Sequence, residues 1–326
     1  MSRKLLTLSL TATLMGGIAY ADTPLVAVDI APVHSLVERV MEGVGTPDLI
    51  IQPGATPHEY SLRPSEAAAL QNADLIFWVA PDLTPWLTDA IETLASDATV
   101  TELLEADGTI ELDIREGALF EAHDDDDEHD GEDDHDEEAG HDDHDDEVAM
   151  DDGHDHGAHD PHAWLSPQNA MTWLNVIAGE LSATDPDNAG AYFANAAAGR
   201  AEIEILIDEV NATLEPVRDG KFIVFHDAYQ YFEMDFDFPA SGAISISDAS
   251  DPSPARIVEI QSRIAEQGID CVLAEPQFNP GLVATVLDGT EAQTGILDPL
   301  GSDLEPGPAL YPQLIRNLST ALAGCM

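Results

Sequence analysis

Basic residues, cysteines and long apolar runs are all scarce in this chain. Its 11 Lys and Arg are set against 64 Asp and Glu, which gives a formal net charge of −53 at pH 7. Nucleic acids and anionic membranes are bound by basic patches, so this charge excludes both as natural partners and favours the attraction of cations. Beyond residue 21, no stretch approaches the roughly 20 apolar residues that a membrane-spanning helix needs.

The two cysteines, Cys271 and Cys325, both lie in the C-terminal part of the chain. In an oxidising compartment an even number of cysteines is more often bridged than free. A bridge would tie the end of the chain to the body of the last domain, and two unpaired thiols are the alternative.

The N-terminus has the features of a signal peptide at residues 1–21. Arg3 and Lys4 precede an apolar core of about 14 residues, and residues 19–21 read Ala-Tyr-Ala, the small-x-small pattern of a cleavage site. We therefore expect a mature chain that begins near Asp22 and resides in the periplasm. A retained N-terminal anchor is the alternative, and no cysteine stands at the cleavage site to carry a lipid.

Residues 121–160 differ in composition from the rest of the chain. The segment is crowded with Asp and Glu, has no Lys or Arg and contains almost no large apolar residue. Such a segment cannot bury enough surface to offset its ordering entropy, so it predicts a mobile loop inserted into a folded lobe. Eight of the chain's twelve histidines lie in it: His123, His129, His135, His141, His144, His154, His156 and His159.

On both sides of this loop, short apolar runs alternate with helical stretches. Pro64 and Pro254 each stand in the first turn of a predicted helix, and the second of these helices ends at Gly268. Alternation of this kind predicts two α/β lobes that are built alike, each around a parallel sheet. The predicted strands are residues 25–28, 49–51, 75–79, 222–225, 243–246 and 270–274.

A long helix is predicted between the two lobes, from residue 185 to about 215, where Pro216 stops it. Its apolar residues recur at spacings of three and four, which marks a single buried face. About 30 residues at ~1.5 Å each would span ~45 Å, the length of a domain, so we expect a rigid linking helix rather than an ordinary surface helix. The predicted division is an N-terminal lobe at 22–183, the linking helix at 184–216 and a C-terminal lobe at 217–326.

Four histidines lie outside the acidic loop, namely His34, His58, His162 and His226. His34 is expected to begin the first helix. The other three stand where a strand or turn opens onto the edge of a lobe, and ligands of open parallel sheets bind at the carboxyl ends of strands. One such histidine is more often structural, but three together indicate a metal site, and three imidazoles favour Zn²⁺ over Mg²⁺, Ca²⁺ and Mn²⁺.

Residues 53–65 read Pro-Gly-Ala-Thr-Pro-His-Glu-Tyr-Ser-Leu-Arg-Pro-Ser. This motif resembles the segment that carries the first metal ligand in the zinc-uptake solute-binding proteins of ABC transporters, the ZnuA type. Together the matching blocks span nearly the whole mature chain. The others are residues 71–75, 160–165, 225–232, 271–278 and 297–301.

The resemblance implies two Rossmann-like lobes joined by a rigid helix, with one Zn²⁺ site in the cleft between them. By that resemblance the metal ligands are His58, His162 and His226. Asp298 matches a position that supplies a carboxylate in many relatives, so it is expected to lie near the site and to contribute a fourth ligand directly or through a water, the alternative being that a water alone fills the fourth position. Some zinc members carry an acidic residue just before the first ligand, but this chain has Pro57 there.

Further expectations follow from the same resemblance. It implies a disulfide between Cys271 and Cys325, and delivery of zinc to an ABC permease in the inner membrane by a monomeric protein that is not an enzyme. Periplasmic zinc chaperones are additional candidate partners. Glu59 and Glu275 are interpreted as residues that make turn hydrogen bonds. The acidic loop, typical of the zinc branch, is expected to bind further zinc ions weakly, the alternative being a solvated tether.

Three other functions stay open at this point. Manganese uptake is disfavoured, because manganese sites of this superfamily typically pair two histidines with two carboxylates, whereas His226 is a third histidine. A secreted zinc hydrolase also uses three protein ligands and a water, but the chain lacks a short ligand motif such as His-Glu-x-x-His. A periplasmic zinc buffer or an adhesin would depend on the acidic loop more than on the cleft.

Overall fold

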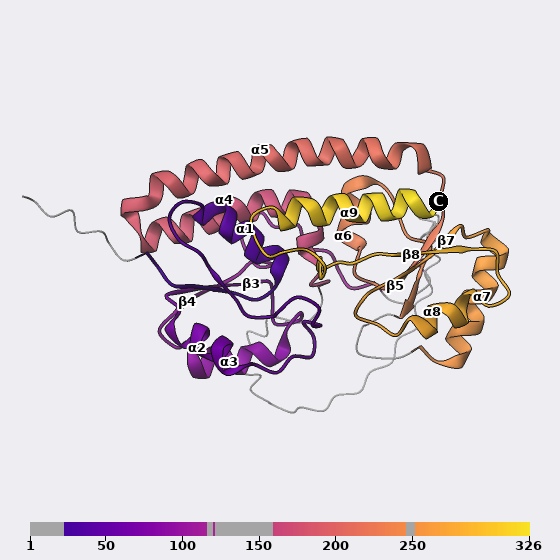
Figure 1. Cartoon of the computed structure of the whole chain (residues 1–326), viewed down its shortest axis with the longest axis horizontal. Coiled ribbons are helices and arrows are strands. Elements are labelled where there is room, and N and C mark those ends of the chain that lie inside the picture. The colour runs from indigo at the N-terminus through magenta and orange to yellow at the C-terminus, as the bar shows by residue number, and fades with distance from the viewer. Residues whose placement is uncertain (1–22, 116–119, 121–158, 246–251) are drawn as a thin grey trace, which may run out of the picture.

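The computed structural model describes residues 23–115, 120, 159–245 and 252–326. The predicted signal peptide and most of the histidine-rich loop therefore lie outside the described residues. Within the described part, two four-stranded parallel sheets form two α/β lobes, as predicted (Figure 1).

The first sheet has the order β2-β1-β3-β4 and consists of β1 (Val26–Val28), β2 (Asp48–Leu49), β3 (Leu75–Trp78) and β4 (Thr99–Glu102). The second has the order β6-β5-β7-β8 and consists of β5 (Phe222–His226), β6 (Ala243–Ser245), β7 (Cys271–Ala274) and β8 (Gln293–Ile296).

The central strands of each sheet are buried, except at Ala274, the last residue of β7, which is partly exposed. Every residue of β1, β3 and β5 is buried, which is the usual state of parallel strands whose two faces are both covered by helices. The edge strands β4 and β8 are largely exposed. The equivalent strand order of the two sheets confirms that the lobes are built alike.

Helices flank both sheets, and several begin at a proline. Because proline has no amide hydrogen to leave unpaired, it suits the first turn, and it occupies that turn in α2 and α7, as predicted. Gly268 ends α7 in the left-handed conformation, with φ of +65°. The helices of the first lobe are α1 (Ala31–Met41), α2 (Pro64–Asn72) and α3 (Pro85–Leu94). Those of the second are α6 (Gln230–Phe236), α7 (Pro254–Gln267), α8 (Pro280–Leu287) and α9 (Leu310–Cys325).

A long helix runs along both lobes on one side of the molecule (Figure 1). This helix, α5 (Ala189–Leu214), packs against α1, α9 and the preceding helix α4 (Pro167–Thr184). Its buried residues recur at spacings of three and four, as the sequence predicts, and include Ile203 and Leu206. The α-helix begins at residue 189 instead of 185, because a short 3-10 turn (Pro186–Asn188) precedes it. The predicted domain boundaries remain a prediction.

A disulfide joins Cys271 at the start of β7 to Cys325 at the end of α9. It fixes the last helix to the second sheet, which is the bridge that the sequence led us to expect. None of the helices in the described ranges combines the length and the apolar character that a bilayer crossing requires.

Candidate metal centre

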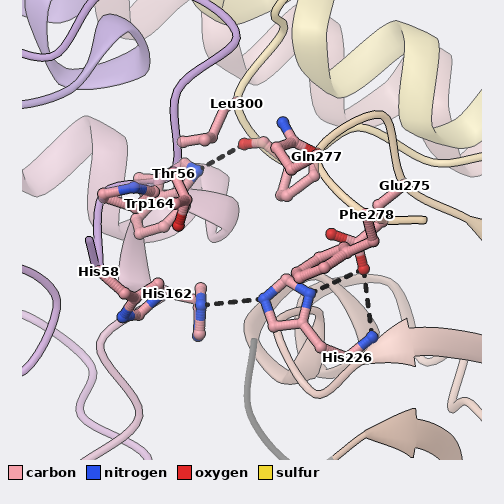
Figure 2. A pocket seen from close by; sticks show the side chains of 11 residues that line it. Thr56, His58, His162, Trp164, His226, Glu275, Gln277, Phe278 and Leu300 are labelled. Atoms are coloured by element: carbon pink, nitrogen blue, oxygen red, sulfur yellow. Dashed lines mark hydrogen bonds and ion pairs between the residues drawn. The ribbon is translucent and has the colours of Figure 1, made fainter. Parts of the chain in front are cut away.

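Three histidines from separate parts of the chain meet at one pocket between the lobes. His58 lies in the loop that follows β2, His162 immediately precedes a 3-10 turn (Ala163–Leu165), and His226 is the last residue of β5. The ring centroids of His58 and His162 are 5.7 Å apart, and those of His162 and His226 are 5.2 Å apart (Figure 2). The structure therefore brings together the three histidines singled out from the sequence.

The separation of two ring nitrogens suits a shared metal ion. Nε2 of His226 lies 3.4 Å from Nε2 of His162. Two imidazoles bound tetrahedrally to Zn²⁺ at about 2.0–2.1 Å place their nitrogens about 3.3–3.4 Å apart. Within the described ranges, however, no three His, Cys, Asp or Glu side chains lie close enough together to hold an ion without moving. The side chains would have to shift to close a coordination sphere around all three rings.

Two buried carboxylates orient two of these histidines. Asp160 Oδ1 accepts hydrogen bonds from Nδ1 and the backbone N–H of His162, at 2.7 and 2.9 Å. Glu275 Oε1 accepts the corresponding bonds from Nδ1 and the backbone N–H of His226, at 2.7 and 3.2 Å. A carboxylate at Nδ1 assigns the proton to that nitrogen, leaves Nε2 as the metal-binding nitrogen and raises its basicity.

Burial perturbs the carboxyl group of Asp160. Desolvation raises its pKa from 3.8 to about 7, although the backbone N–H of His162 and the charge of Arg115 act in the opposite direction. A positive charge on a neighbouring group favours the ionised form of this buried carboxyl group, as the charge of Arg115 does here.

The sequence did not reveal these two carboxylates. Asp160 was not singled out, and the interpretation of Glu275 as a turn residue is wrong, because its side chain bonds His226, which lies 49 positions away. The spacing Asp-x-His at residues 160–162 was an available signal for the first carboxylate. Nothing in the sequence marks the second, because β5 and β7 pair only in the folded chain.

Apolar side chains form part of the wall of the pocket, whose cavity volume is about 20 Å³. The rings of Phe278 and His226 are edge-on, with centroids 5.4 Å apart, and the ring centroids of Trp164 and His162 are 5.3 Å apart. The indole N–H of Trp164 donates to the carbonyl of Pro299 at 2.8 Å, which ties this wall to the second lobe (Figure 2). Apolar walls of this kind lower the local dielectric, so charges beside them interact more strongly than in water.

The loop that carries His58 is fixed on both sides of the histidine. Trp86 Nε1 donates to the carbonyl of Pro57 at 2.7 Å. The hydroxyl of Tyr60 donates to Glu66 at 2.8 Å, and the rings of Tyr60 and Trp86 are 5.6 Å apart. Helices α2 and α3 thus position this ligand candidate.

Asp298 lies close to the pocket but is not among the residues that line it. Its Oδ1 accepts from Leu300 N at 3.0 Å and from Gln277 Nε2 at 3.1 Å. Its Oδ2 accepts from the backbone N–H and the hydroxyl of Ser302, at 2.6 and 2.7 Å. Both oxygens are therefore engaged in the turn after β8, and a direct bond to a metal would have to replace one of these contacts.

An arginine connects the stem of the acidic loop to the segment that follows His226. Arg115 forms ion pairs with Asp227 and with Glu233 of α6, the second at 2.8 Å. Both carboxylates are buried, and burial raises their pKa values whereas Arg115 lowers them. The guanidinium also lies 3.6 Å from the ring centre of Phe120.

The other histidines of the chain lie away from the pocket or outside the described residues. His34 lies within α1, where its Nε2 contacts the carbonyl of Pro47 at 3.0 Å away from the pocket. His159 is 3.5 Å from Glu111 and 3.3 Å from Asp113, at the stem of the acidic loop. The other loop histidines lie outside the described residues: His123, His129, His135, His141, His144, His154 and His156.

Comparisons with known proteins give a consistent picture. The family model described as "Zinc-uptake complex component A periplasmic" matches residues 26–325. A protein of Brucella abortus named "High-affinity zinc uptake system protein ZnuA" is 49% identical over 304 residues, covering 92% of this chain and 91% of the relative. A protein of the same name from Paracoccus denitrificans is 47% identical over 309 residues, covering 94% and 93%. Among solved structures, one described as "Crystal structure of ZnuA" superimposes with a TM-score of 0.71 at 22% identity, covering 93% of this chain and 99% of that one, which shows a shared fold.

Proposed function

Because the chain belongs to the ZnuA family of periplasmic zinc-uptake components, we propose that it captures Zn²⁺ and delivers it to a membrane permease. The observation that carries the proposal is the meeting of His58, His162 and His226 at one enclosed pocket. Two of these imidazoles are oriented by carboxylates, with their Nε2 atoms at the spacing that a tetrahedral zinc ion needs. Zinc is the cargo of this site.

The proposed ligands are the three Nε2 atoms of these histidines. Imidazole suits Zn²⁺ better than it suits Mn²⁺, which prefers carboxylate and water oxygens. The cavity of about 20 Å³ has room for little more than one water-sized body, so an ion must shed most of its hydration shell to enter. Asp298 is proposed to serve the fourth position through a water, or directly if one of its turn hydrogen bonds is replaced, because it lies beside the pocket wall at Gln277.

The proposed partners follow from the family and from the charge of the chain. We expect an ABC permease of the inner membrane to receive the zinc, with periplasmic zinc chaperones as further candidates and the protein acting as a monomer. The net charge of −53 concentrates cations around the molecule, which favours rapid capture of Zn²⁺.

The histidine-rich segment at 121–160 is proposed as an accessory that binds additional zinc weakly and supplies the pocket. We expect a variant without residues 121–160 to keep one tight site and to lose only the weaker binding. Isothermal titration calorimetry with Zn²⁺ measures both classes of site, and loss of the tight site in this variant would contradict the accessory role.

Substitution of a ligand tests the central proposal. We expect His226→Ala to weaken tight zinc binding by at least about a hundredfold, because a three-imidazole site loses one of its three strong bonds. His34→Gln is the matched control, since His34 is also buried but contacts Pro47 away from the pocket. Calorimetry against a competing chelator measures the affinity, and equal zinc affinity in His226→Ala and the wild type would reject the site.

A further inference from the structure

His162 lies in a segment outside the helices and strands. Neither Asp160 nor His162 belongs to regular structure, and Pro161 between them has no amide hydrogen to donate. His226, by contrast, is the last residue of β5 and pairs with Ser245 of β6. The position of the His162 ring therefore depends on side-chain contacts, among them those of Asp160, whose carboxylate accepts from its Nδ1 and its backbone N–H.

The hydroxyl of Tyr231 fixes the backbone of Asp160. It accepts a hydrogen bond from the backbone N–H of Leu112 at 3.0 Å and donates one to the carbonyl of Asp160 at 2.8 Å. A backbone N–H can only donate and a carbonyl can only accept, so the two partners determine both directions. Tyr231 is 0% exposed, so water cannot readily replace the hydroxyl, and its loss would leave both backbone groups without these bonds.

The residue before Tyr231 contacts the carboxylate of Asp160. In the amide orientation that satisfies both of its polar atoms, Gln230 donates to Asp160 Oδ2 at 3.3 Å and to the carbonyl of Asp113 at 3.2 Å. The other carboxylate oxygen, Oδ1, is the one that accepts from His162. Gln230 and Tyr231 are the first two residues of α6, so the first turn of this helix holds both the backbone and the side chain of Asp160.

We propose that Tyr231 and Gln230 are positioning residues for zinc capture, which act through Asp160 to hold the ring of His162 opposite that of His226. The proposal rests on the proposed function, since it concerns two of the three proposed ligands. The chain continues from His226 directly into α6 and so returns to the residue that orients His162, a ligand 64 positions away in the sequence. The Nε2 atoms of the two rings face each other at 3.4 Å (Figure 2). The first turn of α6 thus keeps the two imidazoles at a spacing that suits one ion before zinc arrives.

The first test is the zinc affinity of Tyr231→Phe, measured on the full chain by calorimetry against a competing chelator. Zinc binds more tightly when its ligands are already oriented, because less conformational entropy is then lost on binding. Since a neutral hydrogen bond makes a modest net contribution, we expect binding about threefold to tenfold weaker in this variant. Tyr192→Phe is the matched control: Tyr192 is also 0% exposed, and its hydroxyl donates to Asp185 at 2.9 Å from α5. Both variants lose a buried hydrogen bond, but only Tyr231→Phe should lose zinc affinity.

A double-mutant cycle shows whether Tyr231 acts through Asp160. Asp160→Ala already releases the ring of His162, so removal of the Tyr231 hydroxyl in that background should weaken zinc binding by less than about twofold. A residue that only stabilised the fold would have the same effect in both backgrounds. Equal losses of affinity from Tyr231→Phe in the wild-type and Asp160→Ala chains would overturn the proposal.

The metal-free chain provides a readout that does not depend on zinc. Nitrogen-15 NMR of histidine-labelled protein detects the Nδ1–H of His162, bonded to Asp160, and that of His226, bonded to Glu275. Tyr231→Phe should broaden the His162 signal and leave the His226 signal unchanged, with His162→Gln and His226→Gln assigning the two. An unchanged His162 signal would overturn the proposal, whereas failure of the wild-type chain to bind zinc would reject the proposed function, so the two failures are distinguishable.

A milder variant tests the same link if Tyr231→Phe does not fold. Gln230→Leu removes the donor to Asp160 Oδ2 but keeps the Tyr231 hydroxyl, so weaker zinc binding and a broader His162 signal are expected here as well. Gln261→Leu is its matched control, because the Gln261 amide donates to the carbonyl of Thr285 from α7. Wild-type zinc affinity and an unchanged His162 signal in Gln230→Leu would overturn the role of this turn.

Discussion

Removal of the carboxylate beside His226 gives the most direct test of how the site is organised. Glu275→Gln preserves the size of the side chain and leaves an oxygen able to accept from His226 Nδ1, but it removes the negative charge at 2.7 Å. The Glu275 side chain is only 1% exposed, so solvent does little to screen this charge. The imidazole becomes less basic and less firmly oriented, and zinc loses a nearby compensating charge.

Loss of such an outer carboxylate costs about 10- to 100-fold in metal affinity. This corresponds to about 1.4–2.8 kcal/mol of binding free energy. We expect no loss of folding stability, because removing an ionised group from a buried position relieves a desolvation cost. The affinity change is therefore separable from unfolding.

Calorimetry with a competing chelator at neutral pH measures the affinity, and thermal unfolding of the metal-depleted protein monitors the fold. Asp185→Asn is the control, because Asp185 is a buried carboxylate that bonds Tyr192 and Asn188 between α4 and α5. A zinc affinity of Glu275→Gln within about twofold of the wild type would refute the orienting role, since that is well below the predicted range.

Two further predictions concern stability. Arg115→Gln leaves the buried carboxylates of Asp227 and Glu233 without their cation, so the free energy of unfolding should fall by about 3 kcal/mol or more. Arg39→Gln is the control: its free energy of unfolding in urea should fall by less than about 1 kcal/mol, because the partner Glu202 is exposed. Equal decreases in the two variants would contradict the argument. Burial raises the pKa of Asp29 from 3.8 to about 7. The folded chain therefore holds a proton that the unfolded chain has already released, and stability should fall by up to about 1.4 kcal/mol per unit as pH rises between these values. Urea unfolding of Asp29→Asn at pH 5 and 7 should lack this contribution, and an unchanged pH dependence would show that another group causes it.

The fold was predictable wherever burial leaves a pattern in the sequence. The continuous apolar run at 75–79 corresponds to β3, and Pro64 and Pro254 begin the helices that they predict. The edge strand β4 (Thr99–Glu102) was not predicted, because its residues are partly exposed and carry no apolar run. The segment becomes a strand because it pairs with β3, and this pairing cannot be predicted from the neighbouring residues in the sequence.

The histidines of the site were predictable because imidazoles at strand ends are chemically conspicuous. Their partners were not, since an acidic residue in a chain with 64 Asp and Glu carries little information. Glu275 becomes identifiable only when β7 lies beside β5 and brings it to His226.

We expect the adjustment that would close a coordination sphere to fall mainly on His58. His162 and His226 are each held by a carboxylate through both a ring nitrogen and a backbone N–H. They also lie next to regular structure, a 3-10 turn and a β-strand. His58 instead lies in the loop between β2 and α2, fixed at its neighbour Pro57 by the indole of Trp86. A loop residue changes its backbone dihedrals at less cost than a strand residue, whose ladder hydrogen bonds would break. We therefore expect the two oriented imidazoles to form the preformed part of the site, and His58 to complete it through a shift of its loop within the limits that Trp86 sets.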